Sequence, residues 1–429
     1  MFTPEKKYKV AVVGSGISGI STAWFLSQRH EVTLFEKNLT LGGHTNTLDV
    51  TLPNGEHTAV DTGFIVYNEP NYPLLKAMFA HLNVDTYPTD MSFAVSIDQG
   101  RLEYAGNNLN TLFAQRKNLV SARHWRMILD ILRFNKLAKA DLVRGLDPKL
   151  TLGQYLKNNG FGLTMQQDYL LPMAAAIWSC PTATMSKFPA QSFLQFFANH
   201  GLLSVDDRPQ WQTVVQGART YLNKILALNA FQVMHQGITQ VQAASSVKDS
   251  VVLSTANEEH HEFDQVIFAC HGDESHDLLK GQGFDLLENF SYQYNEAWLH
   301  TDKTQMPKVR SAWASWNYLS GKSRQAEREV AVTYWMNKLQ PLGITEELFV
   351  TLNPITEPRA DLTLQKIDYS HPVFDQKAIQ AQSQLHTIQG HRKCWFAGAY
   401  TGYGFHEDGL ASAARIAKMW HLALPWEAQ

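Results

Sequence analysis

The sequence has few cysteines and no long hydrophobic run, and each absence excludes a class of protein. Its 429 residues include three cysteines, which lie far apart and form no C-x-x-C pair. We therefore expect neither a disulfide framework nor a metal site. Such a chain suits a reducing cytoplasm. The longest apolar run spans 170–178 and contains Pro172, so no stretch approaches the ~18 apolar residues of a transmembrane helix.

The sequence also lacks a charge excess of either sign. The formal net charge is −3, so no global basic field is present to attract nucleic acid. The hydrophobic fraction of 44% and the charged fraction of 18% are ordinary for globular proteins, which excludes a disordered, collagenous or coiled-coil chain. At about 150 residues per domain, the length predicts two or three domains.

The N-terminal segment has the pattern of a dinucleotide-binding βαβ unit. An apolar run at Val10–Val13 predicts a buried strand, a near-helical pattern follows, and 31–35 predicts a second strand. Gly14, Gly16 and Gly19 stand between the first strand and the helix in the spacing G-x-G-x-x-G. Because strand, helix and second strand accompany the glycines, we predict a dinucleotide site rather than a glycine-rich structural turn.

Each part of this motif has a physical role. Gly14 allows the tight turn, Gly16 lets the backbone approach a pyrophosphate, and Gly19 lets helix and strand pack closely. The helix that starts at Ile17 offers unpaired N–H groups and the positive end of its dipole to the phosphates. Glu36, near the position expected about 20 residues on, can accept from ribose hydroxyls and argues against NADP as the ligand.

A second glycine motif, Gly42-Gly43-His44, follows Glu36 closely. With the first motif, it resembles the FAD-dependent amine oxidase superfamily, which includes phytoene desaturases and protoporphyrinogen oxidases. That family has Gly-Gly-Arg here, beside the FAD pyrophosphate. His44 replaces the arginine, so it can donate a hydrogen bond but is no fixed cation. Without the preceding motif, the two glycines are equally typical of a hairpin turn. The neighbouring residues Lys37 and Thr45 belong to the same predicted site.

Three weaker elements resemble the same family. Asp61-Thr62-Gly63 is similar to its Asp-x-Gly element, which returns the chain towards the flavin, although the tripeptide is also an ordinary turn signal. Gln216–Arg219 resembles the family's Gly-Gly segment before a short helix. Ile238 stands where the family packs a β-branched residue against adenine. Plain α/β core is the alternative for the last two.

The C-terminal stretch 396–417 resembles the family's second flavin signature. There, a strand that ends near Gly398 leads through a loop to a helix whose N-terminus points at the isoalloxazine, where the dipole stabilises the anionic reduced flavin. The resemblance implies that Gly409 admits the backbone and that the Leu410 N–H is the donor. Asp408 either contacts the cofactor or caps the helix.

Residues beside the start of this helix supply the candidate catalytic groups. His406 and Glu407 are candidates by proximity alone. The family usually has an acid after the Ala-Gly pair, to hold the ribityl chain, and this sequence has Ala399 there. Since no cysteine or histidine attachment motif is present, the resemblance implies FAD that is bound non-covalently.

The positions of these motifs predict an α/β fold in which a Rossmann-like FAD-binding domain of the amine oxidase type is interrupted by an inserted α+β substrate domain. The FAD-binding domain is expected to be discontinuous, at 1–85, 206–280 and 385–429. The substrate domain is expected at 86–205 and 281–384.

The expected substrate domain contains a basic segment at 116–144. Eight Lys or Arg residues stand there against Asp130 and Asp141, with apolar residues at near-helical spacing. Such a helix can lie on anionic lipid as a peripheral membrane contact. The alternative is a solvated helix whose apolar side faces the core.

Four further stretches, at 199–203, 313–318, 333–340 and 404–409, resemble a bacterial subgroup of FAD/NAD-binding proteins found with cyclopropane-fatty-acid-synthase-like methyltransferases. Some members resemble flavin desaturases of furan fatty acid synthesis. The resemblance implies an FAD oxidoreductase that desaturates a lipid acyl chain, in the cytoplasm or on the inner face of the membrane. Two alternatives remain open: a flavin amine oxidase that releases hydrogen peroxide, and a non-catalytic flavin- or lipid-binding partner of a methyltransferase.

Overall fold

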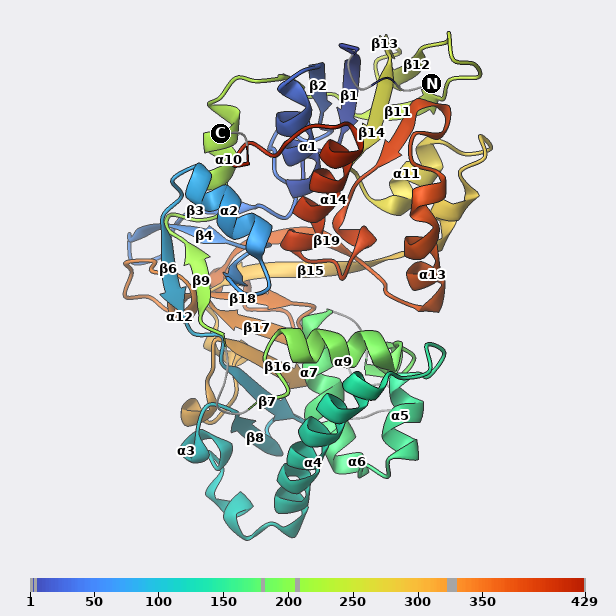
Figure 1. The fold of residues 1–429 in the computed structure, drawn as a ribbon. Coiled ribbons are helices and arrows are strands. Elements are labelled where there is room, and N and C mark those ends of the chain that lie inside the picture. Colours follow the sequence, from blue (N-terminus) through green and yellow to red (C-terminus); the bar gives the residue numbers. More distant parts are fainter. Residues whose placement is uncertain (1–2, 4–5, 179–181, 205–208, 322–329, 428–429) are drawn as a thin grey trace.

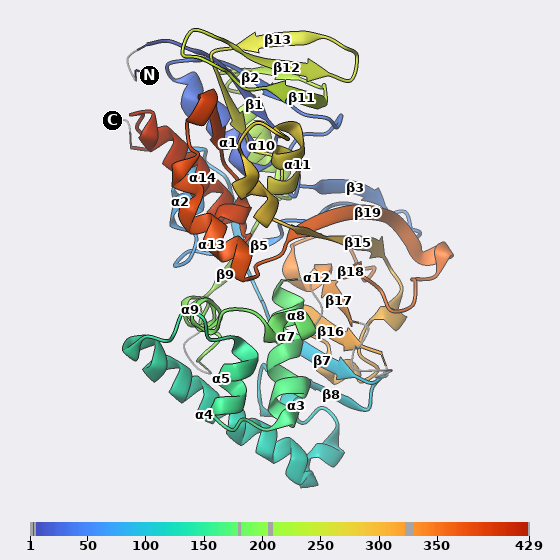
Figure 2. The ribbon, with the colours of Figure 1, turned by 90° about the vertical axis from the view of Figure 1, so that its right-hand side faces the viewer.

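The computed structural model describes residues 3, 6–178, 182–204, 209–321 and 330–427. A parallel sheet with its helices forms one end of the molecule, and a larger sheet with a helical layer forms the other (Figures 1 and 2). This mixed architecture confirms the predicted α/β fold class. The expected domain boundary between 205 and 206 lies outside the described residues, as does Cys180.

The parallel sheet has five described strands in the order β10-β2-β1-β14-β20. They are β1 (Lys9–Val13), β2 (Glu31–Phe35), β10 (Gln232–Met234), β14 (Gln265–Phe268) and β20 (Cys394–Phe396). Every neighbouring pair is parallel. The inner strands are apolar and buried because helices or further strands cover both faces of such a sheet. Strands from the beginning, middle and end of the chain thus form one sheet.

Helices α1 (Ile17–Ser27) and α14 (His406–Met419) pack against each other beside this sheet (Figure 1). The other elements at this end are α2 (Pro73–His81), α10 (Arg219–Leu226), α11 (Gly272–Leu278), α13 (Gln376–Gln384), and the small sheet of β11 (Ile238–Gln242), β12 (Val251–Thr255) and β13 (His260–Phe263). Helix α13 buries Ala378 and Ala381 in the core of this end, although the expected boundary assigns it to the substrate domain. The boundaries therefore stay a prediction.

The larger sheet has seven described strands in the order β19-β15-β18-β17-β16-β7-β8. They are β7 (Phe93–Ile97), β8 (Leu102–Ala105), β15 (Tyr292–His300), β16 (Trp316–Ser320), β17 (Val330–Trp335), β18 (Phe349–Leu352) and β19 (Thr363–Pro372). All pairs are antiparallel except β7 with β16. Connecting strands run between the two ends: β3 (Thr47–Thr51), β4 (His57–Asp61), β5 (Val66–Asn68), β6 (Thr86–Thr89) and β9 (Trp211–Val214).

The helical layer lies against the larger sheet (Figure 2). Its elements are α3 (Leu109–Leu112), η1 (Arg116–Val120), α4 (Ala122–Arg144), α5 (Leu152–Asn158), α6 (Leu163–Met165), η2 (Gln166–Leu170), α7 (Leu171–Ile177), α8 (Thr182–Ser186) and α9 (Ala190–Asn199). Helix α4 begins where the Ser121 hydroxyl accepts from His124 N–H, and it ends at Gly145, whose φ is +81°. Within the described ranges, no helix is both long and apolar enough to cross a bilayer.

Candidate functional site

The first glycine motif forms a tight cradle between β1 and α1. Gly14 has a φ of +100°, and its N–H donates to the Phe35 carbonyl over 2.8 Å. A Cβ added at Gly19 would lie 1.8 Å from the Gly14 carbonyl oxygen, so close packing requires glycine there. Gly16 differs, because an added Cβ would meet no heavy atom of the described chain within 4 Å. The cradle therefore leaves open space at the glycine that we expect to face a ligand.

The start of α1 presents free donors to this space. Gly16 is the N-cap and has no side-chain cap. The first bond inside the helix runs from Ile20 N–H to the Gly16 carbonyl, at 3.0 Å. The N–H groups of Ile17 and Ser18 precede this bond and are left for another acceptor. Together with the helix dipole, they make an anion site that fits a pyrophosphate.

Glu36 closes the cradle at the end of β2. It is 8% exposed, and one carboxylate oxygen accepts from the backbone N–H and the hydroxyl of Ser15, at 3.0 and 2.6 Å. The Ser15 hydroxyl in turn accepts from Gly42 N–H. Sequence reasoning missed this serine, whose only signal was its place between two motif glycines. A carboxylate has about four acceptor positions, so Glu36 can still receive a ribose hydroxyl.

The second glycine motif folds back onto the first. A Cβ on Gly43 would lie 3.4 Å from the Gly16 Cα. A Cβ on Gly63 would lie 2.3 Å from the His44 carbonyl oxygen, which leaves room only for glycine. The Asp-Thr-Gly element thus returns the chain to this loop. Four predicted positions, at Gly16, Gly43, His44 and Gly63, are brought together.

His44 is a buried polar group beside this loop. Its Nε2 has no hydrogen-bond partner among the described residues. The ring stacks on Tyr369 with centroids 4.7 Å apart and lies 5.2 Å from His371. Burial holds the pKa of His44 well below its usual value of 6.5, and the other histidines nearby act in the same direction. The ring is therefore neutral and offers a hydrogen bond rather than a fixed charge.

Lys37 and Ile238 lie beside the end of β2 that carries Glu36. The Lys37 ammonium pairs with Glu274 over 2.6 Å, which raises the pKa of the lysine. A Cβ on Gly237 would lie 3.2 Å from the Lys37 Cβ, and Ile238 follows as the first residue of β11. Cofactor contact by these two residues stays a prediction.

Asp61 is fully buried and contacts several parts of the protein. Its carboxylate accepts from the Thr47 hydroxyl, from Ala218 N–H at the start of α10, and from the Gln340 amide at 2.7 Å. Burial raises the pKa of Asp61 to about 6. These contacts give Asp61 a structural role, and direct contact with a cofactor stays a prediction.

The start of α14 packs on the start of α1, as the two distant motifs predicted. The Ser18 hydroxyl donates to the Gly409 carbonyl over 3.0 Å. A Cβ on Gly409 would lie 2.6 Å from the Ile17 Cγ2. Gly398 N–H donates to the Ser412 hydroxyl over 2.9 Å, which ties the end of β20 to the same helix. The N-termini of both helices therefore meet beside the glycine cradle.

The hydrogen bonds at the start of α14 indicate which of its donors are free. Gly409 N–H already donates to the Phe405 carbonyl over 3.1 Å, so the free donors of α14 lie before Gly409. The Leu410 N–H, which we expected to be the donor, lies one residue beyond this first bond, and its contact with a cofactor stays a prediction. Asp408 accepts from Phe405 N–H over 2.9 Å and thereby caps the helix. Burial raises the pKa of Asp408 to about 6.

His406, the first residue of α14, is enclosed by protein groups. Its ring stacks on Phe64 with centroids 3.8 Å apart. The Tyr221 hydroxyl lies 2.7 Å from the ring Nε2 and also hydrogen-bonds the Thr45 hydroxyl. Burial lowers the pKa of His406 to about 3. These contacts support the loop structurally, and a catalytic role for His406 stays a prediction.

Glu407 lies at the start of another helix. Its two carboxylate oxygens accept from the backbone N–H groups of Leu74 and Leu75, at 2.8 and 3.0 Å. These are first-turn donors of α2, so Glu407 caps that helix from a distant part of the chain. Burial raises the pKa of Glu407 to about 7. This cap gives Glu407 a structural function, and its catalytic role also stays a prediction.

A narrow crevice of about 10 Å³ lies beside His371, between the helical layer and the end of β19. Its wall includes Trp178, Phe188, His371 and Phe374. Among its described lining residues there is no Asp, Glu, Lys or Arg. The Trp178 Nε1 is buried and has no partner among the described residues, and burial lowers the pKa of His371 to about 4. Sequence reasoning missed His371, because nothing in the chain near 371 resembles a motif.

Two sequence comparisons match short parts of the chain. The family described as an NAD(P)-binding Rossmann-like domain matches residues 12–82. A stretch of 41 residues is 51% identical to the 4,4'-diapophytoene desaturase (4,4'-diaponeurosporene-forming) of Staphylococcus aureus (strain bovine RF122 / ET3-1). This match covers 9% of this chain and 8% of the relative, so it concerns a short segment of each protein.

Solved structures match almost the whole chain. A CLA-producing fatty acid isomerase from P. acnes has a TM-score of 0.68 at 13% identity, over 98% of this chain and 99% of that one. Cyclohexylamine oxidase from Brevibacterium oxydans IH-35A has a TM-score of 0.64 at 13% identity, over 97% and 100%. Putrescine oxidase bound to putrescine gives 0.64 at 14% identity, over 96% and 99%. Over nearly its whole length, the chain therefore has the fold that these three enzymes share.

Proposed function

We propose that the chain binds FAD non-covalently and is an FAD-dependent oxidoreductase that removes a hydride equivalent from a C–H bond. The observation that carries this proposal is the meeting of the α1 and α14 N-termini, through Ser18 and Gly409, beside the open space at Gly16. When bound, FAD supplies the hydride acceptor. The chain binds and orients the cofactor and keeps water from the reacting bond.

The residues present fit this cofactor. The free N–H groups at Ile17 and Ser18 suit its pyrophosphate, and Glu36 suits a ribose. The unpartnered Nε2 of His44 is a buried polar atom that a bound ligand would satisfy. The free donors of α14 before Gly409 suit an anionic ring.

An apolar substrate, a lipid acyl chain, agrees with the apolar wall beside His371, although the crevice itself, of about 10 Å³, has room for no more than one water molecule. Its aromatic wall, with Trp178 and Phe188, and its lack of charged groups among the described lining residues suit an uncharged chain. A cationic amine would require a carboxylate or an aromatic cage in its binding site. A fatty acid isomerase is among the proteins with this fold, which is consistent with a lipid substrate.

Two other functions remain as outcomes of the test. Amine oxidation with release of hydrogen peroxide is favoured by the two amine oxidases of similar fold. A flavin- or lipid-binding partner of a methyltransferase would bind FAD without ever reducing it. The three functions differ in what reduces the flavin: a lipid in the first, an amine in the second and no compound in the third.

Gly16→Val tests the cofactor site. We expect FAD affinity to fall at least tenfold, because the new side chain fills the space proposed for the pyrophosphate. The thermal stability of the FAD-free protein should stay unchanged, since an added Cβ meets no protein atom there. Gly106→Val is the matched control, because its Cβ also meets none. Equal FAD affinity of the two variants would contradict the proposed site.

Anaerobic titration of the FAD-loaded protein tests the reaction. Phospholipids with acyl chains of defined unsaturation, putrescine and cyclohexylamine are added separately, and flavin absorbance is followed. We expect bleaching by the phospholipids. Bleaching by the amines alone would overturn the lipid substrate, and a flavin that none of them reduces would favour the non-catalytic partner.

A further inference from the structure

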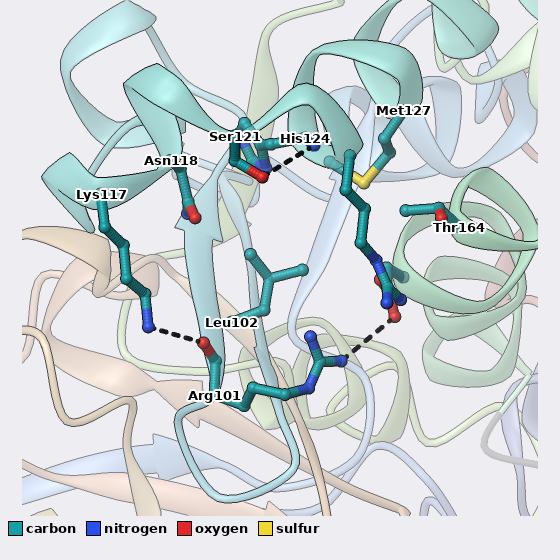
Figure 3. Close-up of a pocket in the computed structure, with 10 residues that line it drawn as sticks. Arg101, Leu102, Lys117, Asn118, Ser121, His124, Met127 and Thr164 are labelled. Carbon is teal, nitrogen blue, oxygen red and sulfur yellow. Dashed lines mark hydrogen bonds and ion pairs between the residues drawn. The ribbon is translucent and has the colours of Figure 1, made fainter.

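A second cavity, of about 260 Å³, lies in the helical layer, at the end of the molecule farthest from the five-stranded sheet (Figures 1 and 3). Its wall is formed by η1, the first turns of α4, α6, η2 and the start of β8. The charged residues of the wall are Arg101, Lys117, Arg123 and Asp168. The cavity belongs to no part of the flavin site described above.

The wall of this cavity carries an excess of positive charge. Asp168 is fully buried and pairs with Arg123 over 2.7 Å and with Arg101 over 3.6 Å. The Lys117 ammonium donates to the Arg101 carbonyl over 3.1 Å. Arg101 also pairs with Asp98, outside the wall, over 2.7 Å. Three cations thus stand against two carboxylates, and the cavity favours an anion that presents oxygen acceptors.

Two buried polar side chains of the wall have an atom without a partner in the described structure. Asn118 is 6% exposed, and its Nδ2 donates to no group. His124 is 3% exposed, and its Nδ1 is unpaired. The His124 Nε2 lies 3.2 Å from the Leu112 carbonyl, so it carries the proton, and Nδ1 is the acceptor. Buried groups of this kind are normally satisfied, so the cavity offers both a donor and an acceptor to a ligand.

These groups match a phosphate that has a hydroxyl beside it. The cations and the Asn118 amide suit the phosphate oxygens, and the His124 Nδ1 suits the proton of a hydroxyl. The headgroup of phosphatidylglycerol combines these features, as does free glycerol phosphate.

The outer surface next to the cavity is apolar and basic. On η1, Leu119 is 49% exposed and Val120 is 89% exposed. On α4, Trp125, Leu129 and Leu132 are 44%, 64% and 50% exposed and follow one another at helical spacing. A contiguous set of large apolar side chains on a surface marks an interaction site.

Cations accompany this apolar stripe. Arg126, Lys136 and Lys139 are exposed on α4, and no hydrogen bond or ion pair of theirs is found in the described structure. An apolar stripe with unpaired cations beside it complements an anionic lipid surface. The basic segment expected from the sequence thus combines a buried face at Met127 and Phe134 with an exposed, unpartnered one.

We propose that this end of the molecule sits on an anionic membrane, with the stripe from Leu119 to Leu132 in the lipid interface, and that the cavity lined by Asn118 and His124 holds the phosphate headgroup of one lipid. The inference deepens the proposed function, on which it rests, by placing the enzyme on the membrane that holds its acyl substrate. The headgroup site anchors the protein and is separate from the flavin site.

Flotation of the FAD-loaded protein with vesicles tests the surface. Vesicles of phosphatidylcholine containing one third phosphatidylglycerol are compared with pure phosphatidylcholine, and we expect at least tenfold tighter binding to the former. The triple variant R126A/K136A/K139A should lose most of this preference. The triple variant K248A/K280A/K377A removes the same charge from exposed lysines at the other end and should keep it. No preference in the unmodified protein, or equal loss in both variants, overturns the proposal.

Asn118→Ala tests the cavity. We expect at least threefold weaker binding to phosphatidylglycerol vesicles and a similar loss with vesicles whose charge comes from phosphatidylserine, because both headgroups present the phosphate that the Asn118 amide would hold. Asn107→Ala, outside the cavity and exposed, is the control and should behave as the unmodified protein. Another outcome is that glycerol phosphate raises the melting temperature of the unmodified protein but not of Asn118→Ala, while neither protein binds vesicles. In that case the ligand is a free phosphate compound, and the membrane proposal is wrong.

Two arginines of this segment are poor choices for such variants. Arg123 pairs with the buried Asp168, and Arg133 donates to the carbonyls of Asn159 and Gly160, so their removal would disturb the fold. The flavin content of every variant is recorded as well. Vesicle binding without lipid-driven flavin reduction would defeat the proposed function and leave this inference standing, and the converse result would do the opposite.

Discussion

The two ends of the molecule position their functional groups by different means. At the nucleotide-binding end, the geometry depends on backbone atoms that come within contact distance, as at Gly19 and Gly63. At the helical end, it depends on large side chains packed between distant elements, as where Phe196 of α9 lies against Phe405 before α14. Close backbone approach can be recognised in a sequence, because only glycine permits it. Side-chain packing cannot be recognised in the same way, because many residue types are compatible with it.

Gly19→Ala tests the first half of this comparison and should have the largest effect. The added Cβ would lie 1.8 Å from the Gly14 carbonyl oxygen, so α1 must move away from β1. Overpacking of this kind costs about 1–3 kcal/mol of folding free energy. Because the N-terminus of α1 also moves away from the proposed pyrophosphate position, we expect FAD binding to weaken by about 100-fold. Fluorescence titration with FAD measures the change, and Gly106→Ala is the control. Unchanged affinity would mean that the cradle is not the site.

Phe196→Ala tests the other half. Phe196 is 2% exposed, and its ring lies 3.9 Å from His200 and 5.1 Å from Phe405. We expect the free energy of unfolding to fall by about 3 kcal/mol, as measured by denaturant unfolding. FAD affinity should change much less, since no glycine contact is altered. Tyr87→Ala, at a 49% exposed ring, should cost little. If the free energy of FAD binding fell by more than the free energy of unfolding, the distinction between the two ends would be contradicted.

The same distinction explains what the sequence could predict. The glycine motifs predicted the βαβ unit, the fold class and the meeting of α14 with α1, because each follows from local backbone chemistry. The Leu410 N–H stays a prediction as the donor, since the first residue of α14 decides which groups are free and sequence places helix ends poorly. His371 and the cavity beside Asn118 could not be predicted, because each is assembled from elements whose contacts are not local.

The stability of the FAD-free protein should depend on pH through His406. Its pKa is about 3 in the folded chain against 6.5 ordinarily, so below pH 6.5 the unfolded chain binds a proton that the folded chain does not. The histidine therefore destabilises the fold progressively from pH 6.5 down to pH 3, by about 2 kcal/mol at pH 5. Unfolding of the unmodified protein and of His406→Gln is measured at pH 7 and pH 5.

We expect the unmodified protein to lose about 2 kcal/mol more than His406→Gln between these two pH values. Glu407 acts in the opposite sense, because its pKa is raised to about 7 and protonation therefore favours the folded chain as the pH falls through 7. Both proteins contain Glu407, so its contribution cancels in the difference. Parallel pH profiles would show that His406 is solvated and that its stack on Phe64 is not maintained.

Tyr221→Phe should have the smallest effect and sharpens the comparison within the nucleotide-binding end. The lost hydroxyl bonds both Thr45 and His406. Thr45 Oγ1 lies 3.4 Å from His406 Nε2, so these two groups can pair directly, and we expect a loss of only about 1 kcal/mol in unfolding free energy. Tyr87→Phe, at an exposed ring, is the control. If Thr45 only supports the loop, FAD affinity should stay within about twofold. The loss of about 1 kcal/mol then lowers the unfolding free energy and leaves the free energy of FAD binding unchanged. A tenfold loss would instead place the Thr45 hydroxyl against the cofactor, and side-chain chemistry would then matter at this end as much as backbone approach.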